Sequence, residues 1–180
     1  VYATDTQYYD TTGAIAYSST FNPAESIVDT SPLPSNGCPA GDSAKGFGAG
    51  CLTDDQLANE VQSVISDQGW NTGTNTMFFI FPPSGIRVCF SASGSTCSDN
   101  AFCAYHNSIG SGSSIVIYAV QPEESGWPSG CGTDQAPQGV GSVESTLSTI
   151  SHEHNEAITD PDTSGQLNTG GWYTSGGAEN

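Results

Sequence analysis

The sequence predicts an α+β fold in which a twisted, mixed β-sheet packs against two main helices and disulfides staple the loops. Apolar residues recur at helical spacing in two stretches, 53–68 and 143–159. Short apolar and β-branched runs occupy most of the region between them, from Met77 to Val120. Six cysteines are present, and none forms a Cys-x-x-Cys pair.

The length and composition fit one extracellular domain spanning residues 1–180. A chain of 180 residues with 35% hydrophobic content is long enough for one core and too short for two comfortable ones. No apolar run reaches the roughly 18 residues that a membrane span needs. The chain opens on Val1-Tyr2-Ala3 without the features of a leader, so we expect any signal peptide to have been removed.

The first helix is predicted over residues 53–68. Thr53 stands at the N-cap position, and Gln56, three residues later, completes a capping box. Leu57, Val61 and Ile65 then recur at helical spacing, and the pattern ends before Gly69.

Strands are predicted where apolar or β-branched residues cluster between turn residues. The expected strands are 1–9, 26–30, 77–81, 86–91, 101–106 and 114–120. The runs 77–81 and 86–91 flank a Ser-Gly turn, which predicts a buried β-hairpin. Residues 31–50 and 121–141 are rich in Gly, Pro and Ser and are expected to form irregular loops.

The cysteines are expected to form three disulfides. Because closing a short loop costs less entropy than closing a long one, neighbouring cysteines are the favoured pairs. The expected pairs are Cys38–Cys51, Cys89–Cys97 and Cys103–Cys131. Disulfides place the chain outside the cytosol, as a secreted protein.

The charge of the chain excludes two classes of partner. There are 19 acidic residues, Lys45 and Arg87 are the two basic ones, and the formal net charge is −17. A protein that binds nucleic acid or an anionic membrane must neutralise phosphates with cations that this chain lacks. We therefore expect neither partner, whereas self-assembly remains compatible with the Gly- and Ser-rich surface.

The second helix, predicted over 143–159 and stopped by Pro161, carries the motif HExxE. His152 and Glu156 are four positions apart, so they project from one helix face, as the two metal ligands of zinc peptidases do. In the usual HExxH pattern the intervening Glu, here Glu153, is the general base that takes a proton from the attacking water. His154 lies on a different face. The alternative is that this helix end is a solvated surface.

The metal predicted at this motif is zinc, with calcium as the alternative. A second carboxylate ligand adds negative charge, makes the ion a poorer Lewis acid and widens the choice of metal toward calcium or manganese. A third ligand must come from elsewhere. Glu179, twenty-three residues after Glu156, and Asp160, a turn further along the helix, are both candidates.

Two further side chains are candidates for stabilising an oxyanion. His106 follows an expected strand, and Tyr173 lies in the segment after the helix. The alternatives are structural: His106 as a hydrogen-bonding residue beside Cys103, and Tyr173 packing with Trp172.

Five segments together resemble a known family. They are the block 151–161 (SHEHNEAITDP), Trp172-Tyr173, 177–180 (GAEN), 6–9 (TQYY) and 102–106 (FCAYH). In these segments the chain resembles the secreted phosphate-induced (Exordium-like) proteins of plants and their microbial relatives. The resemblance implies an extracellular protein with a zincin-like fold, in a family whose plant members are growth-associated apoplastic proteins.

Two functions follow as hypotheses of different classes. The first is a zinc-dependent peptidase acting on a peptide or protein substrate, with metal on His152, Glu156 and Glu179, Glu153 as base, and His106 or Tyr173 at the oxyanion. The second is a non-catalytic extracellular protein, structural or associated with the cell wall, that holds a structural ion or none.

Overall fold

The computed structural model describes residues 9–10, 13–14, 18–123, 131 and 142–161. The chain divides into two compact units, Val1–Leu33 and Pro34–Asn180. In the first unit, β1 (Tyr9–Asp10) pairs antiparallel with β2 (Gly13–Ala14). The described end of the expected strand 1–9 therefore belongs to a small ribbon and not to the larger sheet, and the rest of that strand lies outside the described residues.

The strand expected at 26–30 is wrong. These residues follow a short 3-10 helix, η1 (Pro23–Glu25), and have no regular structure. Their side chains are exposed, Val28 by 87%. A β-prone stretch becomes a strand only when it pairs and buries one face, and this stretch is not buried.

Helix α2 (Asp54–Gln68) confirms the prediction for 53–68. The Thr53 hydroxyl accepts a hydrogen bond from the Gln56 N–H at 3.4 Å, and the Gln56 side chain accepts one from the Thr53 N–H at 3.0 Å. This capping box satisfies two otherwise unpaired donors at the helix start. Gly69 ends the helix with a left-handed φ of 66°, which glycine adopts without strain.

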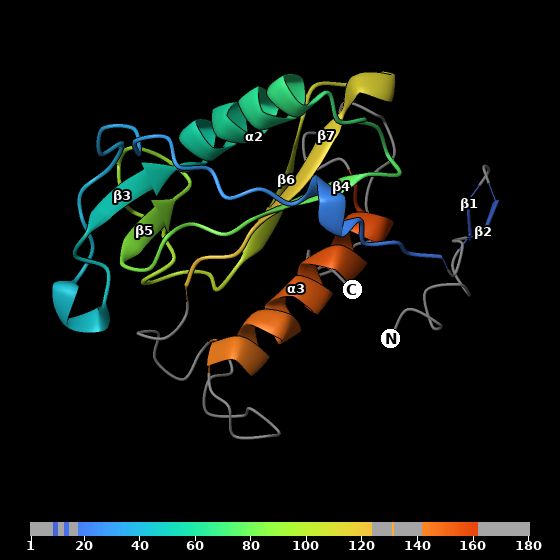
Figure 1. The fold of residues 1–180 in the computed structure, drawn as a ribbon. Coiled ribbons are helices and arrows are strands. Elements are labelled where there is room, and N and C mark those ends of the chain that lie inside the picture. The colour runs from blue at the N-terminus through green and yellow to red at the C-terminus, as the bar shows by residue number, and fades with distance from the viewer. Residues whose placement is uncertain (1–8, 11–12, 15–17, 124–130, 132–141, 162–180) are drawn as a thin grey trace. The chain divides into compact units, whose positions relative to one another are not determined.

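The strands of the second unit form two sheets (Figure 1). One pairs β3 (Gly50–Thr53) in parallel with β5 (Ile86–Cys89). The other is a mixed sheet in the order β4–β7–β6, where β4 is Met77–Ile80, β7 is Val116–Val120 and β6 is Tyr105–Ile109. β4 runs parallel to the central β7, and β6 runs antiparallel to it.

The hairpin expected between 77–81 and 86–91 is wrong, although both segments contain strands. β4 pairs with β7, and β5 pairs with β3, in each case in parallel. A continuous apolar run indicates a buried strand but does not identify its partner. β3 was not expected at all, and β6 begins at Tyr105 instead of residue 101 and continues to Ile109.

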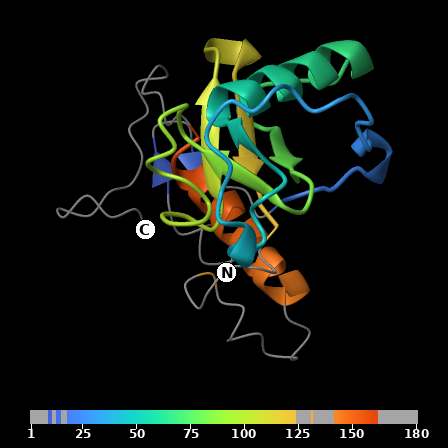
Figure 2. The ribbon, with the colours of Figure 1, turned by 90° about the vertical axis from the view of Figure 1, so that its left-hand side faces the viewer.

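The two helices cover opposite faces of the mixed sheet, as the two views show (Figures 1 and 2). Side chains alternate between the faces of a strand. In β6, Tyr105 reaches α2 through a hydrogen bond to Asp54, whereas its neighbour His106 contacts Glu153 on α3. The larger apolar core lies on the α2 side, and a small cluster of Ile115, Ile117 and Ala157 lies on the α3 side.

Helix α3 (Ser142–Thr159) ends before Pro161, as expected, but most of the side chains that it is seen to bury are polar although its apolar residues recur at helical spacing. Leu147 is 60% exposed. The inward positions at four-residue spacing are Ser145, Thr149, Glu153 and Ala157, of which Ser145, Glu153 and Ala157 are buried and Thr149 is half-buried. A polar stripe turned toward a sheet indicates a site more than a packing face.

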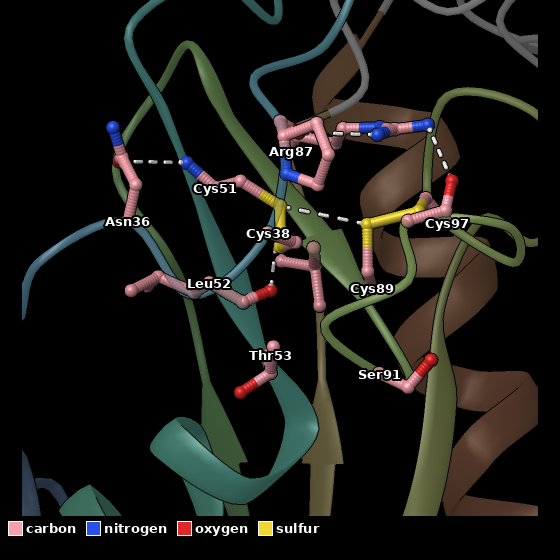
Figure 3. Close-up of a disulfide and its surroundings, with 12 residues drawn as sticks. Asn36, Cys38, Cys51, Leu52, Thr53, Arg87, Cys89, Ser91 and Cys97 are labelled. Atoms are coloured by element: carbon pink, nitrogen blue, oxygen red, sulfur yellow. Dashed lines mark hydrogen bonds between the residues drawn. A yellow bond between two sulfur atoms is a disulfide. The ribbon is translucent and has the colours of Figure 1, made fainter.

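The three disulfides are Cys38–Cys51, Cys89–Cys97 and Cys103–Cys131, which confirms the expected pairing. The first two lie against each other, with the Cys51 and Cys89 sulfurs 3.5 Å apart (Figure 3). The parallel pair β3–β5 brings them together, since both cysteines lie on these strands.

Candidate functional site

A pocket of about 320 Å³ lies between α3 and the start of β6. Its lining combines polar residues from both elements with aromatic residues. The lining residues are Phe90, Ala104, Tyr105, His106, His152, Glu153 and Glu156. The pocket therefore contains four of the residues that the sequence singled out, from segments far apart in the chain.

His106 is buried in β6 and makes two hydrogen bonds, one to α3 and one to the residue that follows the helix. Its Nδ1 lies 3.2 Å from Glu153 Oε2, and its Nε2 lies 3.1 Å from the backbone carbonyl oxygen of Asp160. Nδ1 is also 3.6 Å from Glu156 Oε2. Because both ring nitrogens are engaged, this geometry makes His106 a residue that holds Glu153 and ties the end of α3 to the sheet.

The residues of the HExxE motif lie at different depths in the pocket. Glu153 is buried, with 5% of its side chain exposed, next to His106. His152 lies at the rim, with 65% of its side chain exposed, and its Nε2 is 2.8 Å from Glu156 Oε1. The α-helix places residues four apart on one face, so His152 and Glu156 meet directly.

The pKa values of His106 and Glu156 move in opposite directions. Burial alone would lower the pKa of His106, but the carboxylates of Glu153 and Glu156 and the Asp160 carbonyl raise it to about 10. Burial alone would raise the pKa of Glu156, but hydrogen bonds from His106 and His152 lower it to about 2. At neutral pH the metal-free site thus pairs an imidazolium with ionised carboxylate.

Two overlapping groups of side chains carry donor atoms of the kind that bind a divalent cation, and one of them offers two donors and the other three. The first is the rim pair, His152 Nε2 and Glu156 Oε1. The second is the buried trio of His106, Glu153 and Glu156, whose donor atoms all lie within 4.8 Å of one another. Nitrogen and carboxylate oxygen donors suit zinc or manganese, and a histidine among them makes calcium a poorer fit.

A second group of possible metal donors among the described residues does not qualify. Cys38, Cys51 and Cys89 lie close together (Figure 3), but all three sulfurs belong to disulfides. Metal binding by cysteine requires a thiolate, which a disulfide does not offer.

The other predicted site residues fall in different places. The backbone carbonyl of Asp160 binds His106, and its side chain is buried. His154 is half-buried, and its ring centre is 6.4 Å from that of Phe79 in β4, away from the pocket lining. Glu179 and Tyr173 lie outside the described residues, so the third ligand and the oxyanion donor stay predictions.

The sequence patterns did not predict the aromatic side of the pocket. Phe90 stacks on Phe102 with ring centres 4.7 Å apart, and the ring of Tyr105 is nearly perpendicular to both. The Tyr105 hydroxyl donates to Asp54 Oδ1 at 2.8 Å, and burial together with Asp54 raises the pKa of Tyr105. Phe90 follows β5, whereas Phe102 and Tyr105 lie three residues apart near the start of β6, so no local pattern groups all three.

None of the helices within the described part of the chain is long and apolar enough to cross a bilayer. Comparison of the chain with family models, with curated proteins and with solved structures gives no match.

Proposed function

We propose that the chain is a secreted, zincin-like metallopeptidase that uses zinc to hydrolyse peptide bonds in the pocket between α3 and β6. The observation that carries this proposal is that His152 and Glu156 present donor atoms 2.8 Å apart at the rim of a pocket that also contains Glu153. Catalytic zinc sites stay open on one side, which a rim position allows. Three disulfides agree with folding in an oxidising, extracellular compartment.

In this proposal each protein residue has a defined task. His152 and Glu156 hold the ion, with Glu179 as the expected third ligand. A divalent ion supplies Lewis acidity toward a peptide carbonyl and toward water. Glu153 accepts a proton from the attacking water and passes it to the departing amine, so that one water is consumed for each bond broken. His106 fixes Glu153 in place through the 3.2 Å contact.

The second candidate is a non-catalytic protein with a structural ion. It is favoured by the cluster of His106, Glu153 and Glu156, whose possible donor atoms all lie within 4.8 Å of one another. An ion bound there would take His106, Glu153 and Glu156 as ligands, which would leave Glu153 unable to act as a base. The two candidates therefore differ in which residues bind the metal.

Metal content measured by mass spectrometry separates the two. For the peptidase, we expect about one zinc per chain, lost in His152→Ala and retained in Glu153→Gln, because Glu153 is then a base and not a ligand. For the structural ion, the metal is lost in Glu153→Gln and in His106→Gln but kept in His152→Ala. His154→Ala, next to the site but outside the pocket lining, is the control and should keep the metal in both cases.

Cleavage of a peptide library tests the reaction itself. We expect Glu153→Gln to lower kcat about 100-fold or more while zinc stays bound, because the charge that accepts the proton is removed at nearly constant shape. If Glu153→Gln cleaved the peptides at the same rate as wild type, the mechanism would be contradicted. No cleavage by zinc-loaded wild type would favour the structural candidate.

A further inference from the structure

An exposed aromatic ring forms one wall of the pocket. Phe90 is 46% exposed although it belongs to an aromatic cluster and lines the cavity next to His106. Its ring lies 4.7 Å from that of Phe102 with a 22° angle between the planes, and 4.9 Å from that of Tyr105 at 80°. Exposed apolar surface next to convergent polar groups is typical of a ligand site.

Disulfides and hydrogen bonds next to Phe90, Phe102 and Tyr105 hold this aromatic cluster in place. Phe90 follows Cys89, which is bonded to Cys97, and its N–H donates to the Thr96 carbonyl at 3.1 Å. Phe102 precedes Cys103, which is bonded to Cys131. The Tyr105 hydroxyl is fixed on Asp54 at 2.8 Å. A surface ordered before binding loses little conformational entropy when a ligand covers it, which favours affinity.

The pocket thus has two chemically different sides. His106, Glu153 and Glu156 are polar and charged, whereas Phe90 is an exposed aromatic residue that lines the same cavity. A polypeptide matches such a pocket, since a polar peptide group carries an apolar side chain next to it. Stacking of an aromatic side chain on an existing aromatic pair is favourable beyond the burial of area alone.

We propose that Phe90, supported by Phe102 and Tyr105, is a specificity-determining residue that binds an aromatic side chain of the peptide beside the bond to be cut. This inference rests on the proposed peptidase function. It names the substrate class: peptides with an aromatic residue at the position that reaches Phe90.

The test compares two blocked pentapeptides that are identical apart from a central phenylalanine or serine among glycines. Their dissociation constants are measured by NMR titration with wild type, Phe90→Ser and Phe90→Tyr in the presence of zinc. We expect wild type to prefer the phenylalanine peptide and Phe90→Ser to bind it about tenfold more weakly, with little change for the serine peptide. Phe90→Tyr keeps the ring and should keep the preference.

A matched control is Phe81→Ser, because Phe81 is also exposed, by 57%, but does not line the pocket. It should bind both peptides as wild type does, and circular dichroism checks that each variant is folded. Equal binding of both peptides by wild type, or an equal loss for both in Phe90→Ser, would overturn the inference.

Cleavage followed in the same samples separates this inference from the proposed function. If wild type prefers the phenylalanine peptide, Phe90→Ser loses this preference and neither peptide is cleaved, the aromatic subsite is supported and the peptidase function is not. Cleavage of both peptides with a preference that Phe90→Ser leaves unchanged supports the peptidase and overturns the subsite.

Discussion

His106 and Glu156 make the stability of the metal-free protein depend on pH. The pKa of His106 is raised from 6.5 to about 10, so its contribution is complete below about pH 6.5 and is lost as the pH rises through about 10. The pKa of Glu156 is lowered from 4.5 to about 2, so its contribution is complete above about pH 4.5 and is lost as the pH falls through about 2. Both contributions to stability are therefore complete only between about pH 4.5 and about pH 6.5.

We therefore expect the free energy of unfolding to decline above about pH 6.5, and to decline more in wild type than in His106→Gln. Urea titration in the presence of a chelator measures it. Glutamine keeps hydrogen-bonding capacity but cannot become a cation. Identical pH profiles for the two proteins between about pH 6.5 and 10 would contradict the assigned pKa of His106.

At the scale of single residues, the sequence identified the chemical groups better than their contacts. The spacing of His152 and Glu156 fixes their meeting, because an α-helix alone brings them together. The contact between His106 and Glu153 depends on the packing of β6 against α3, which spacing does not reveal. The sequence did not indicate Phe90 as a site residue, since Phe90 falls inside the expected strand 86–91, where an aromatic residue is usually part of a core.

Among the elements, α2 and two strands of the mixed sheet share one carboxylate as a hydrogen-bond acceptor, in addition to their apolar contacts. Asp54, in the first turn of the helix, accepts hydrogen bonds from the hydroxyls of Tyr105 and Tyr118 and from Asn107 Nδ2, each at 2.8 Å. The two tyrosines are buried, in β6 and β7. Asp54 therefore joins the helix to two neighbouring strands.

Asp54→Ala should destabilise the protein by about 3 kcal/mol, because it leaves two buried hydroxyls without this acceptor. Urea unfolding provides the measurement. Asp55→Ala is the matched control: Asp55 is exposed in the same helical turn, so it tests loss of a charge near the helix N-terminus alone. We expect a cost of about 0.5 kcal/mol or less there. Similar losses in both variants would show that the hydrogen bonds contribute little.

Elements with local signals were predicted well, and their pairing was not. The capping box and Gly69 lie within or beside α2, and Pro161 lies just past the end of α3. The partners of β4 and β5 are far away in the sequence, and parallel pairing leaves no turn signature between them. β3 was missed because its four residues precede a strong helix start and carry no alternation.

At the scale of the whole molecule, the large apolar core and the polar pocket lie on opposite faces of the mixed sheet. The face toward α2 carries the large apolar core, including Leu57, Val61 and Tyr118. Among the described residues, the face toward α3 carries a small apolar cluster together with the buried polar residues of the pocket.

The net charge of −17 should make the stability of the folded chain sensitive to salt. Like charges repel more in the compact state, and the screening length shrinks from about 30 Å at 0.01 M to about 8 Å at 0.15 M ionic strength. We expect sodium chloride over this range to raise the midpoint of thermal unfolding at pH 7. The same series near pH 4.1, the isoelectric point, is the control, because net repulsion is then nearly absent. A rise of equal size at both pH values would indicate a general salt effect, and would mean that the acidic residues are already balanced by their local surroundings.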